Sequence, residues 1–163
     1  MVLDGIEQVI DAGVLAREPC SKLKISLVDI KLHEDAIHRG PAQVYSAVRD
    51  SMRMSIESAG PVLFEPIQTL LVEGPLSHMG NLTKLIQSKR GQVADIEQGA
   101  GHVEIKTKMP VAEMIGLASE IRSSTEGRGN FSMVDQSFEK VPANLQFDVV
   151  KKIRRRKGLK DNE

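Results

Sequence analysis

The sequence has one cysteine, one tyrosine, four phenylalanines and no tryptophan among its 163 residues. A single cysteine, Cys20, excludes an intrachain disulfide and a cysteine-based zinc cluster, and its place beside a proline indicates a structural or incidental residue. The scarcity of aromatic side chains removes most of the base-stacking platforms used by proteins that bind single-stranded RNA. Any contact with RNA would therefore depend on phosphates and on shape.

Long apolar segments are also missing, since no run of 18 or more apolar residues occurs. The first residues, MVLDGIEQVIDAG, place Asp4 and Glu7 where a signal peptide would be basic and then apolar. We therefore expect a cytoplasmic protein with no membrane partner.

Neither sign of charge is in excess, because 22 cations balance 22 anions, but the distribution is uneven. Residues 151–157 (KKIRRRK) hold six of the 22 cations, which leaves 16 cations against 22 anions elsewhere. Two interpretations remain open for this cluster. It is either a solvated helix end, where cations suit the helix dipole, or a surface that contacts RNA or an acidic partner.

The first region reads as helix, strand, helix. Apolar residues at helical spacing predict a helix that ends near Gly13, and the alternation in residues 22–33 (KLKISLVDIKLH) predicts a strand with a possible bulge. Gly40 as a cap and Pro41 at the first position predict a second helix. One strand cannot form a sheet, so residues 1–59 are expected to depend on other strands, on the C-terminal helix, on the second domain or on another chain.

The sequence SAGP at 58–61 predicts a domain boundary. Beyond it the order of patterns is strand, helix, strand, strand, helix, strand, which is typical of a ferredoxin-like α+β sandwich with a four-stranded antiparallel sheet. Pro66 within the first of these strands suggests an edge or a bulge. We expect three parts: a partial first domain over 1–59, the sandwich over 60–142, and a C-terminal basic helix and tail over 143–163.

The polar stretch LHEDAIHRGPAQ, residues 32–43, holds the side chains with the most obvious chemical use. Its two histidines, His33 and His38, are five apart, so on a helix they would differ by roughly 140° and could not form the zinc-protease HExxH site. A metal site in a loop, an acid/base arrangement of His38 with Glu34 or Asp35, and a polar loop that caps the next helix stay open. An exposed loop between a strand and a helix is better suited to contact an outside partner.

The glycine-rich stretch GRGNFS at 127–132 is a weak phosphate signal, and a turn before a strand explains it more simply. No GxxxxGK[ST] sequence occurs. The residues therefore show no nucleotide-binding motif.

At LHEDAIHRGPAQ the sequence resembles translation elongation factor 2 of archaea and eukaryotes, whose fourth domain carries a tip loop of the pattern HxDAxHRGxxQ. The residues that match the loop are His33, Asp35, Ala36, His38, Arg39, Gly40 and Gln43. Further segments resemble the family in order: LAREPC, EPIQTLLVEGP, SKRGQV, PVAEMIGLASEIRSSTEGRGNFSM and IRRRKGL. The resemblance runs from about Leu3 to Leu159, and Ser46 departs from it where the family has a proline.

The resemblance implies that residues 1–59 are the end of domain IV and residues 60–142 are domain V. It implies that His38 is converted to diphthamide, the target of diphtheria-type toxins, and that His33 is not modified. The loop residues His33, Asp35, His38, Arg39 and Gly40 would contact RNA in the decoding region, with Arg39 gripping a phosphate.

By the same resemblance the partners are the ribosome, meaning its ribosomal RNA, the bound transfer and messenger RNA and the stalk base, together with the diphthamide-synthesis enzymes. The family promotes GTP-dependent translocation of tRNA and mRNA, with GTP and Mg in an N-terminal GTPase domain that has no counterpart here. We therefore expect a C-terminal fragment with no catalytic residue, no metal and no cofactor of its own.

Two other functions stay open. The first is a free-standing small RNA-binding or ribosome-associated protein derived from the same domains. The second is a metal-dependent hydrolase that uses His33, Glu34 and His38.

Overall fold

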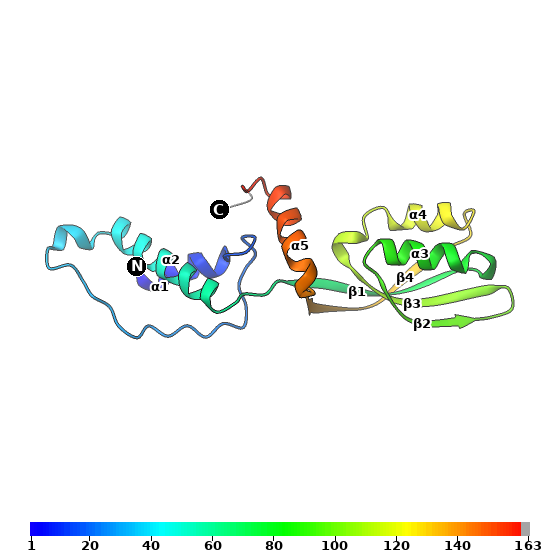
Figure 1. Ribbon diagram of the computed structural model, residues 1–163, viewed down its shortest axis with the longest axis horizontal. Coiled ribbons are helices and arrows are strands. Elements are labelled where there is room, and N and C mark those ends of the chain that lie inside the picture. Colours follow the sequence, from blue (N-terminus) through cyan, green and yellow to red (C-terminus); the bar gives the residue numbers. More distant parts are fainter. Residues whose placement is uncertain (161–163) are drawn as a thin grey trace. The chain divides into compact units, whose positions relative to one another are not determined.

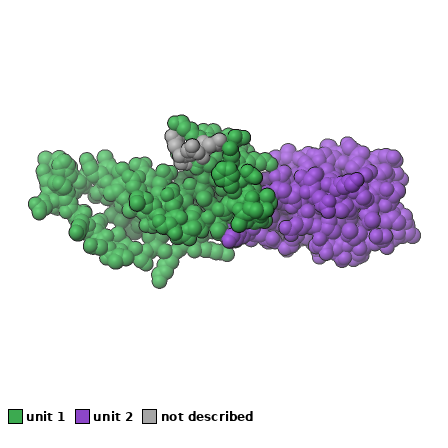
Figure 2. All heavy atoms as spheres, viewed as in Figure 1, with its two compact units in different colours: residues 1–63, 142–163 green, residues 64–141 purple. Residues whose placement is uncertain are grey.

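The computed structural model describes residues 1–160. It consists of two compact units, shown in Figure 2: unit 1 combines residues 1–63 with the C-terminal residues from 142 on, and unit 2 comprises residues 64–141. Among the described residues, no helix has both the length and the apolar character needed to cross a membrane.

Unit 2 contains four strands and two longer helices in the order βαββαβ (Figure 1). The elements are β1 (Phe64–Pro75), α3 (Met79–Ser88), β2 (Gln92–Gln98), β3 (His102–Pro110), α4 (Leu117–Ser124) and β4 (Asn130–Lys140). All neighbouring strands are antiparallel, and the sheet order is β2-β3-β1-β4. The predicted α+β class and the ferredoxin-like sandwich are confirmed.

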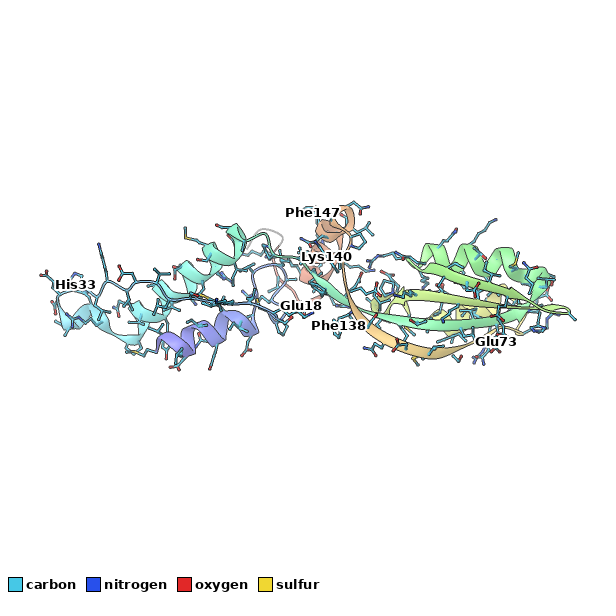
Figure 3. All side chains as sticks on the ribbon, turned by 90° about the horizontal axis from the view of Figure 1, so that it is seen from below. Glu18, His33, Glu73, Phe138, Lys140 and Phe147 are labelled. Atoms are coloured by element: carbon cyan, nitrogen blue, oxygen red, sulfur yellow. The ribbon has the colours of Figure 1, made fainter. Side chains whose placement is uncertain are left out.

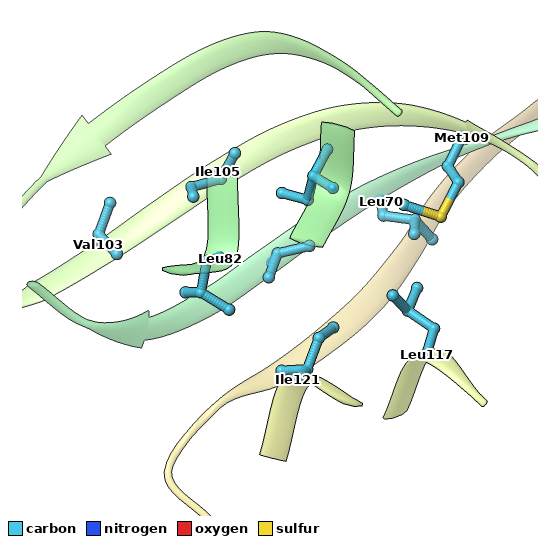
Figure 4. Packing of buried hydrophobic residues seen from close by; sticks show 9 residues of the cluster. Leu70, Leu82, Val103, Ile105, Met109, Leu117 and Ile121 are labelled. Atoms are coloured by element: carbon cyan, nitrogen blue, oxygen red, sulfur yellow. The ribbon is translucent and has the colours of Figure 1, made fainter. Parts of the chain in front are cut away.

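The core of unit 2 lies between one face of the sheet and the helices α3 and α4, which cover that face (Figures 1 and 4). Alternate residues of β1 and β3 point into it, and each helix adds two residues spaced by four, so the periodicities of strand and helix meet in one cluster. Its buried members are Leu70, Val72, Leu82, Ile86, Val103, Ile105, Met109, Leu117 and Ile121.

Pro66 does not mark an edge strand, because β1 lies between β3 and β4 in the middle of the sheet. The expectation of an edge is therefore wrong. Pro66 is paired with Phe138 of β4, while pairing with β3 begins only at Ile67. A residue without an N–H is tolerated there because one neighbour is absent. The register with β4 shifts further along, between Thr69 and Leu70.

Unit 1 contains α1 (Val2–Asp11), α2 (Pro41–Ser58) and α5 (Ala143–Arg156), together with the short 3-10 turn η1 (Ala36–Arg39). Val9 of α1 packs against Met52 and Ile56 of α2 in a small apolar cluster. The two helices approach closely at Gly5, where an added Cβ would lie 3.0 Å from a methyl carbon of Val48. The predicted start of α2, with Gly40 as the cap and Pro41 at the first position, is confirmed.

The prediction of a strand over residues 22–33 is wrong, because the backbone there forms no strand. Its alternating apolar side chains are exposed: Leu23 is 47% exposed, Leu27 63% and Leu32 59%. A strand exists only as part of a hydrogen-bonded ladder, and the only sheet in the described residues belongs to unit 2. The α-β-α arrangement expected for the first region therefore retains its two helices and lacks its strand.

Residues 1–59 were expected to depend on another part of the protein, and the C-terminal helix is one such part. The loop after α1 is held by the last turn of α5 through hydrogen bonds to the backbone oxygens of residues 15–17. The two segments thus form one unit although more than a hundred residues separate them.

Candidate functional site

The candidate site is the loop of residues 33–39, which forms one end of unit 1, where Figure 3 labels His33. Every residue in it is exposed. Since no apolar core holds the loop, its shape depends on local hydrogen bonds.

Asp35 organises the centre of the loop. Its carboxylate accepts a hydrogen bond from the backbone N–H of Ile37 at 3.0 Å, which caps η1. Its carbonyl oxygen accepts from the N–H of His38 at 3.2 Å. A side-chain cap of this kind satisfies an N–H that a short helix would otherwise leave without a partner. Asp35 therefore places His38 within a defined turn.

Arg39 closes the loop. Its Nε donates to the carbonyl oxygen of His33 at 2.5 Å, and its Nη2 donates to that of Glu34 at 2.7 Å. These bonds join positions six and five residues apart, across the whole turn. The planar guanidinium presents two parallel N–H groups, which match two adjacent carbonyl oxygens.

The two histidines meet as a result. The ring centroids of His33 and His38 lie 4.6 Å apart with an angle of 66° between the ring planes, an edge-to-face arrangement. His33 Nδ1 accepts a hydrogen bond from the N–H of Asp35 at 3.1 Å, which requires that this nitrogen carries no proton. The spacing argument against a shared helix face is sound, but the loop brings the rings together by another route.

The rings and carboxylates do not converge further. Among residues 1–160, no group of three or more His, Cys, Asp or Glu side chains is arranged to hold a metal ion. The hydrolase alternative built on His33, Glu34 and His38 thus has no ligand set in this geometry. The other two histidines of the chain, His78 and His102, belong to unit 2 and not to the unit that contains the loop.

Gly40 connects the loop to α2 with φ at −69°, a conformation open to any residue. An added Cβ would lie 3.0 Å from the end of the flexible Gln43 side chain. Backbone strain therefore does not explain a glycine at this position.

The basic cluster is partly structural. Arg154 is buried and donates through Nη1 to the carbonyl oxygen of Leu15 at 3.0 Å. Lys157 donates to the carbonyl oxygens of Ala16 and Arg17 at 3.1 and 2.9 Å, and its ammonium lies 2.7 Å from a carboxylate oxygen of Glu18. Neither pure interpretation of the cluster is adequate, because some of its cations bind the protein's own backbone.

Sequence reasoning missed this role, although a signal was present. Val150, Arg154 and Lys157 follow one another at spacings of four and three, which places them along one side of a helix. Two cations in line with the half-buried Val150 are positioned to reach back to the same unit.

Residues 127–129 of the glycine-rich stretch lie in the turn between α4 and β4, and residues 130–132 begin β4, as the simpler interpretation predicts. Gly127 has φ at +82°, and the N–H of Gly129 donates to the buried hydroxyl of Thr125 at 2.7 Å. The Thr125 hydroxyl donates in turn to the carbonyl oxygen of Ile121 at 2.7 Å. The N–H of Gly129 therefore already has its hydrogen-bond partner within unit 2.

Cys20 is half-buried in unit 1, and its N–H donates to the carbonyl oxygen of Ile10 at 2.7 Å. Burial raises the pKa of the Cys20 thiol above its usual value. The thiol is therefore protonated at neutral pH, which suits an inert residue.

Two family models match the chain. The model described as elongation factor G C-terminus matches residues 62–149, and the model described as elongation factor G, domain IV matches residues 1–60. The chain belongs to the elongation factor G C-terminus family. The resemblance that the loop indicated is confirmed.

Several curated relatives are named elongation factor 2. The protein from Nanoarchaeum equitans is 48% identical over 98% of this chain and 21% of its own length. The protein from Methanoculleus marisnigri is 50% identical over 99% of this chain and 22% of its own length. The chain therefore spans about a fifth of the length of these relatives.

A solved structure gives the same picture for the fold. A crystal structure of a protein from Thermus thermophilus superposes with a TM-score of 0.65 at 24% identity, covering 94% of this chain and 23% of that one. At this identity the likeness concerns the fold alone.

Proposed function

We propose that this chain is the ribosome-contacting C-terminal part of an elongation factor 2, and that His38 is its diphthamide residue. In this assignment residues 1–59 are the end of domain IV, residues 60–142 are domain V, and residues 143–163 are the C-terminal basic helix and tail. The whole protein would promote GTP-dependent translocation of tRNA and mRNA in the cytoplasm, with GTP and Mg bound by its GTPase domain. This part would contribute contacts and no chemistry of its own.

The observation that carries the proposal is the geometry of the loop in a chain so similar to elongation factor 2. His38 lies in an exposed turn at the end of unit 1, so an enzyme can reach its ring without opening a core. The turn is already closed by Asp35 and Arg39. An exposed, pre-ordered loop is suited to recognition by modifying enzymes and by RNA.

Contacts with RNA are proposed for the loop residues His33, Asp35, His38, Arg39 and Gly40. Arg39 is exposed and uses the Nε and Nη2 side of its guanidinium within the loop, and the N–H groups of Nη1 take no part in these two bonds. A guanidinium has five N–H donors, so it can hold the loop and still bind a phosphate oxygen.

Mass spectrometry tests the modification. The chain is produced in a diphthamide-making host and cleaved with trypsin, which releases residues 32–39 with both histidines in one peptide. We expect the added mass on His38 and none on His33, so the second histidine is an internal control. A His38→Gln variant should lose the modification.

The contrary result is equally definite. If His38 is unmodified in a host whose own elongation factor 2 is fully modified, the assignment of this loop as a diphthamide loop is wrong. Modification of His33 in place of His38 would also overturn it.

A further inference from the structure

Arg39 and His38 are adjacent in sequence, but the Arg39 side chain acts on the opposite end of the loop. The guanidinium binds the carbonyl oxygens of His33 and Glu34, the residues where the loop begins. The loop's other hydrogen bonds, from Asp35, Ile37 and His38, connect residues two or three apart. The two bonds from Arg39 therefore determine how close the two ends of the loop lie.

This closure controls the contact between the rings. His33 stands at the first end and His38 at the second, and their centroids are 4.6 Å apart. Both rings are exposed, and no residue of the loop 33–39 is buried. Without the guanidinium, the two ends are joined only through the short-range hydrogen bonds around Asp35, so the ring of His38 is held less firmly against His33.

We propose that Arg39 is a positioning residue that holds the His38 ring against His33 in the orientation that the modifying enzymes recognise. This inference rests on the proposed function of His38 and adds to it a role for Arg39 that phosphate binding does not include. A lysine cannot replace the arginine, because a single ammonium group cannot offer two parallel N–H donors in one plane to adjacent carbonyl oxygens.

The loop geometry is tested by NMR on the full chain with labelled histidines. The chain has four histidines, so ring signals are few, and His33→Gln and His38→Gln variants assign them. We expect a nuclear Overhauser effect between the ring protons of His33 and His38 in the wild type. Arg39→Lys, which keeps the charge, should lose it, and added ethylguanidinium should partly restore it in Arg39→Ala.

The matched control is Arg49→Lys. Arg49 is an exposed arginine on α2, outside the loop, so its replacement should leave the ring contact unchanged. The fluorescence of Tyr45, the only tyrosine, confirms that each variant retains the α1–α2 pair.

The effect on modification is measured in the diphthamide-making host. We expect a lower modified fraction of His38 in Arg39→Lys than in the wild type and in Arg49→Lys after equal expression times. If the ring contact persists in Arg39→Lys, or if it is lost and the modified fraction does not fall, the positioning role is refuted.

The two proposals fail differently. A wild-type chain without modification refutes the proposed function and with it the recognition by modifying enzymes. A modified wild type with an equally modified Arg39→Lys variant leaves the proposed function intact and refutes the role of Arg39.

Discussion

Arg154→Ala should destabilise unit 1, because Arg154 ties three separate segments together. The residue is 8% exposed, and it belongs to α5. Its Nη1 donates to Leu15 in the loop after α1 at 3.0 Å, while Nε and Nη2 donate to the carbonyl oxygen of Lys160 at 2.9 and 2.6 Å. Truncation to alanine removes these three charge-assisted bonds and the side-chain stem that fills the space between the segments.

The magnitude follows from the partners that remain. A hydrogen bond from a charged group contributes about 1.5–3 kcal/mol, but carbonyl oxygens near the surface recover part of this by binding water. Lys160 is exposed and Leu15 only half-buried, so the recovery is substantial. We expect a loss of about 2–3 kcal/mol in the free energy of unfolding, at the upper end of ordinary single substitutions.

The assay uses the only tyrosine as a reporter of unit 1. Tyr45 lies on α2, and its hydroxyl donates to a carboxylate oxygen of Asp4 in α1 at 3.2 Å. With no tryptophan in the chain, urea titration followed by tyrosine fluorescence reports the separation of these two helices. The N–H groups of Gly13 and Arg17 are hydrogen-bonded within the loop after α1. Amide exchange at these two residues reports directly whether α5 still holds that loop.

The control is Arg156→Ala, which removes the same charge from an exposed residue two positions further along α5. We expect a change below about 0.5 kcal/mol for it, as for most surface substitutions. Equal losses of unfolding free energy in the two variants would show that total charge, and not the hydrogen bonds of Arg154, stabilises unit 1. The reasoning would then be refuted.

Three further substitutions are predicted. Leu82→Ala, in the fully buried core of unit 2, should cost about 2–5 kcal/mol by circular dichroism melting, whereas Ile115→Ala, 80% exposed, should cost little. Gly13→Ala should destabilise unit 1 by about 1–3 kcal/mol in the tyrosine assay, because the added Cβ would lie 2.6 Å from the backbone carbonyl oxygen of Glu18. An unchanged urea midpoint would contradict this close contact. The hydrogen bond from Lys108 lowers the pKa of Glu139. That pair therefore stabilises unit 2 above the usual glutamate pKa and loses its effect as pH falls through the lowered value, and Lys108→Met should raise the pKa in a carboxyl NMR titration.

Unit 2 was predictable because its elements follow from local patterns. Alternation in β3, a run of apolar residues in β1, apolar residues spaced by four in α3 and α4, and prolines at the ends of β1 and β3 all point to one arrangement. The side chains that these patterns bring together fill one core. Local and global preferences agree, which is typical of a sequence with a single well-defined fold.

Residues 22–33 show where such reasoning fails. Alternation states which side chains would share a face of a sheet, but it does not state whether a neighbouring strand exists to pair with. The exposure of Val28, at 93%, and of its apolar neighbours shows that no neighbour is present among the described residues of unit 1. Alternation alone therefore predicts a strand here that the structure does not contain.

The loop was predictable in its composition and position, but not in its closure. The residues that match the family pattern include Arg39, for which the resemblance implied a phosphate contact. The structure shows that one side of its guanidinium is already bound to two carbonyl oxygens. A hydrogen bond between residues five or six apart depends on the turn between them, which periodicity does not describe.

Arg39, Arg154 and Lys157 share one use of positive charge, since each binds backbone carbonyl oxygens of unit 1. Carbonyl oxygens outside a helix or sheet need donors, and long cationic side chains can supply several at once. A count of cations therefore overestimates the charge that is available to RNA. For the cluster 151–157, the charge available to an outside partner is smaller than its six cations suggest, because Arg154 and Lys157 already bind residues 15–18.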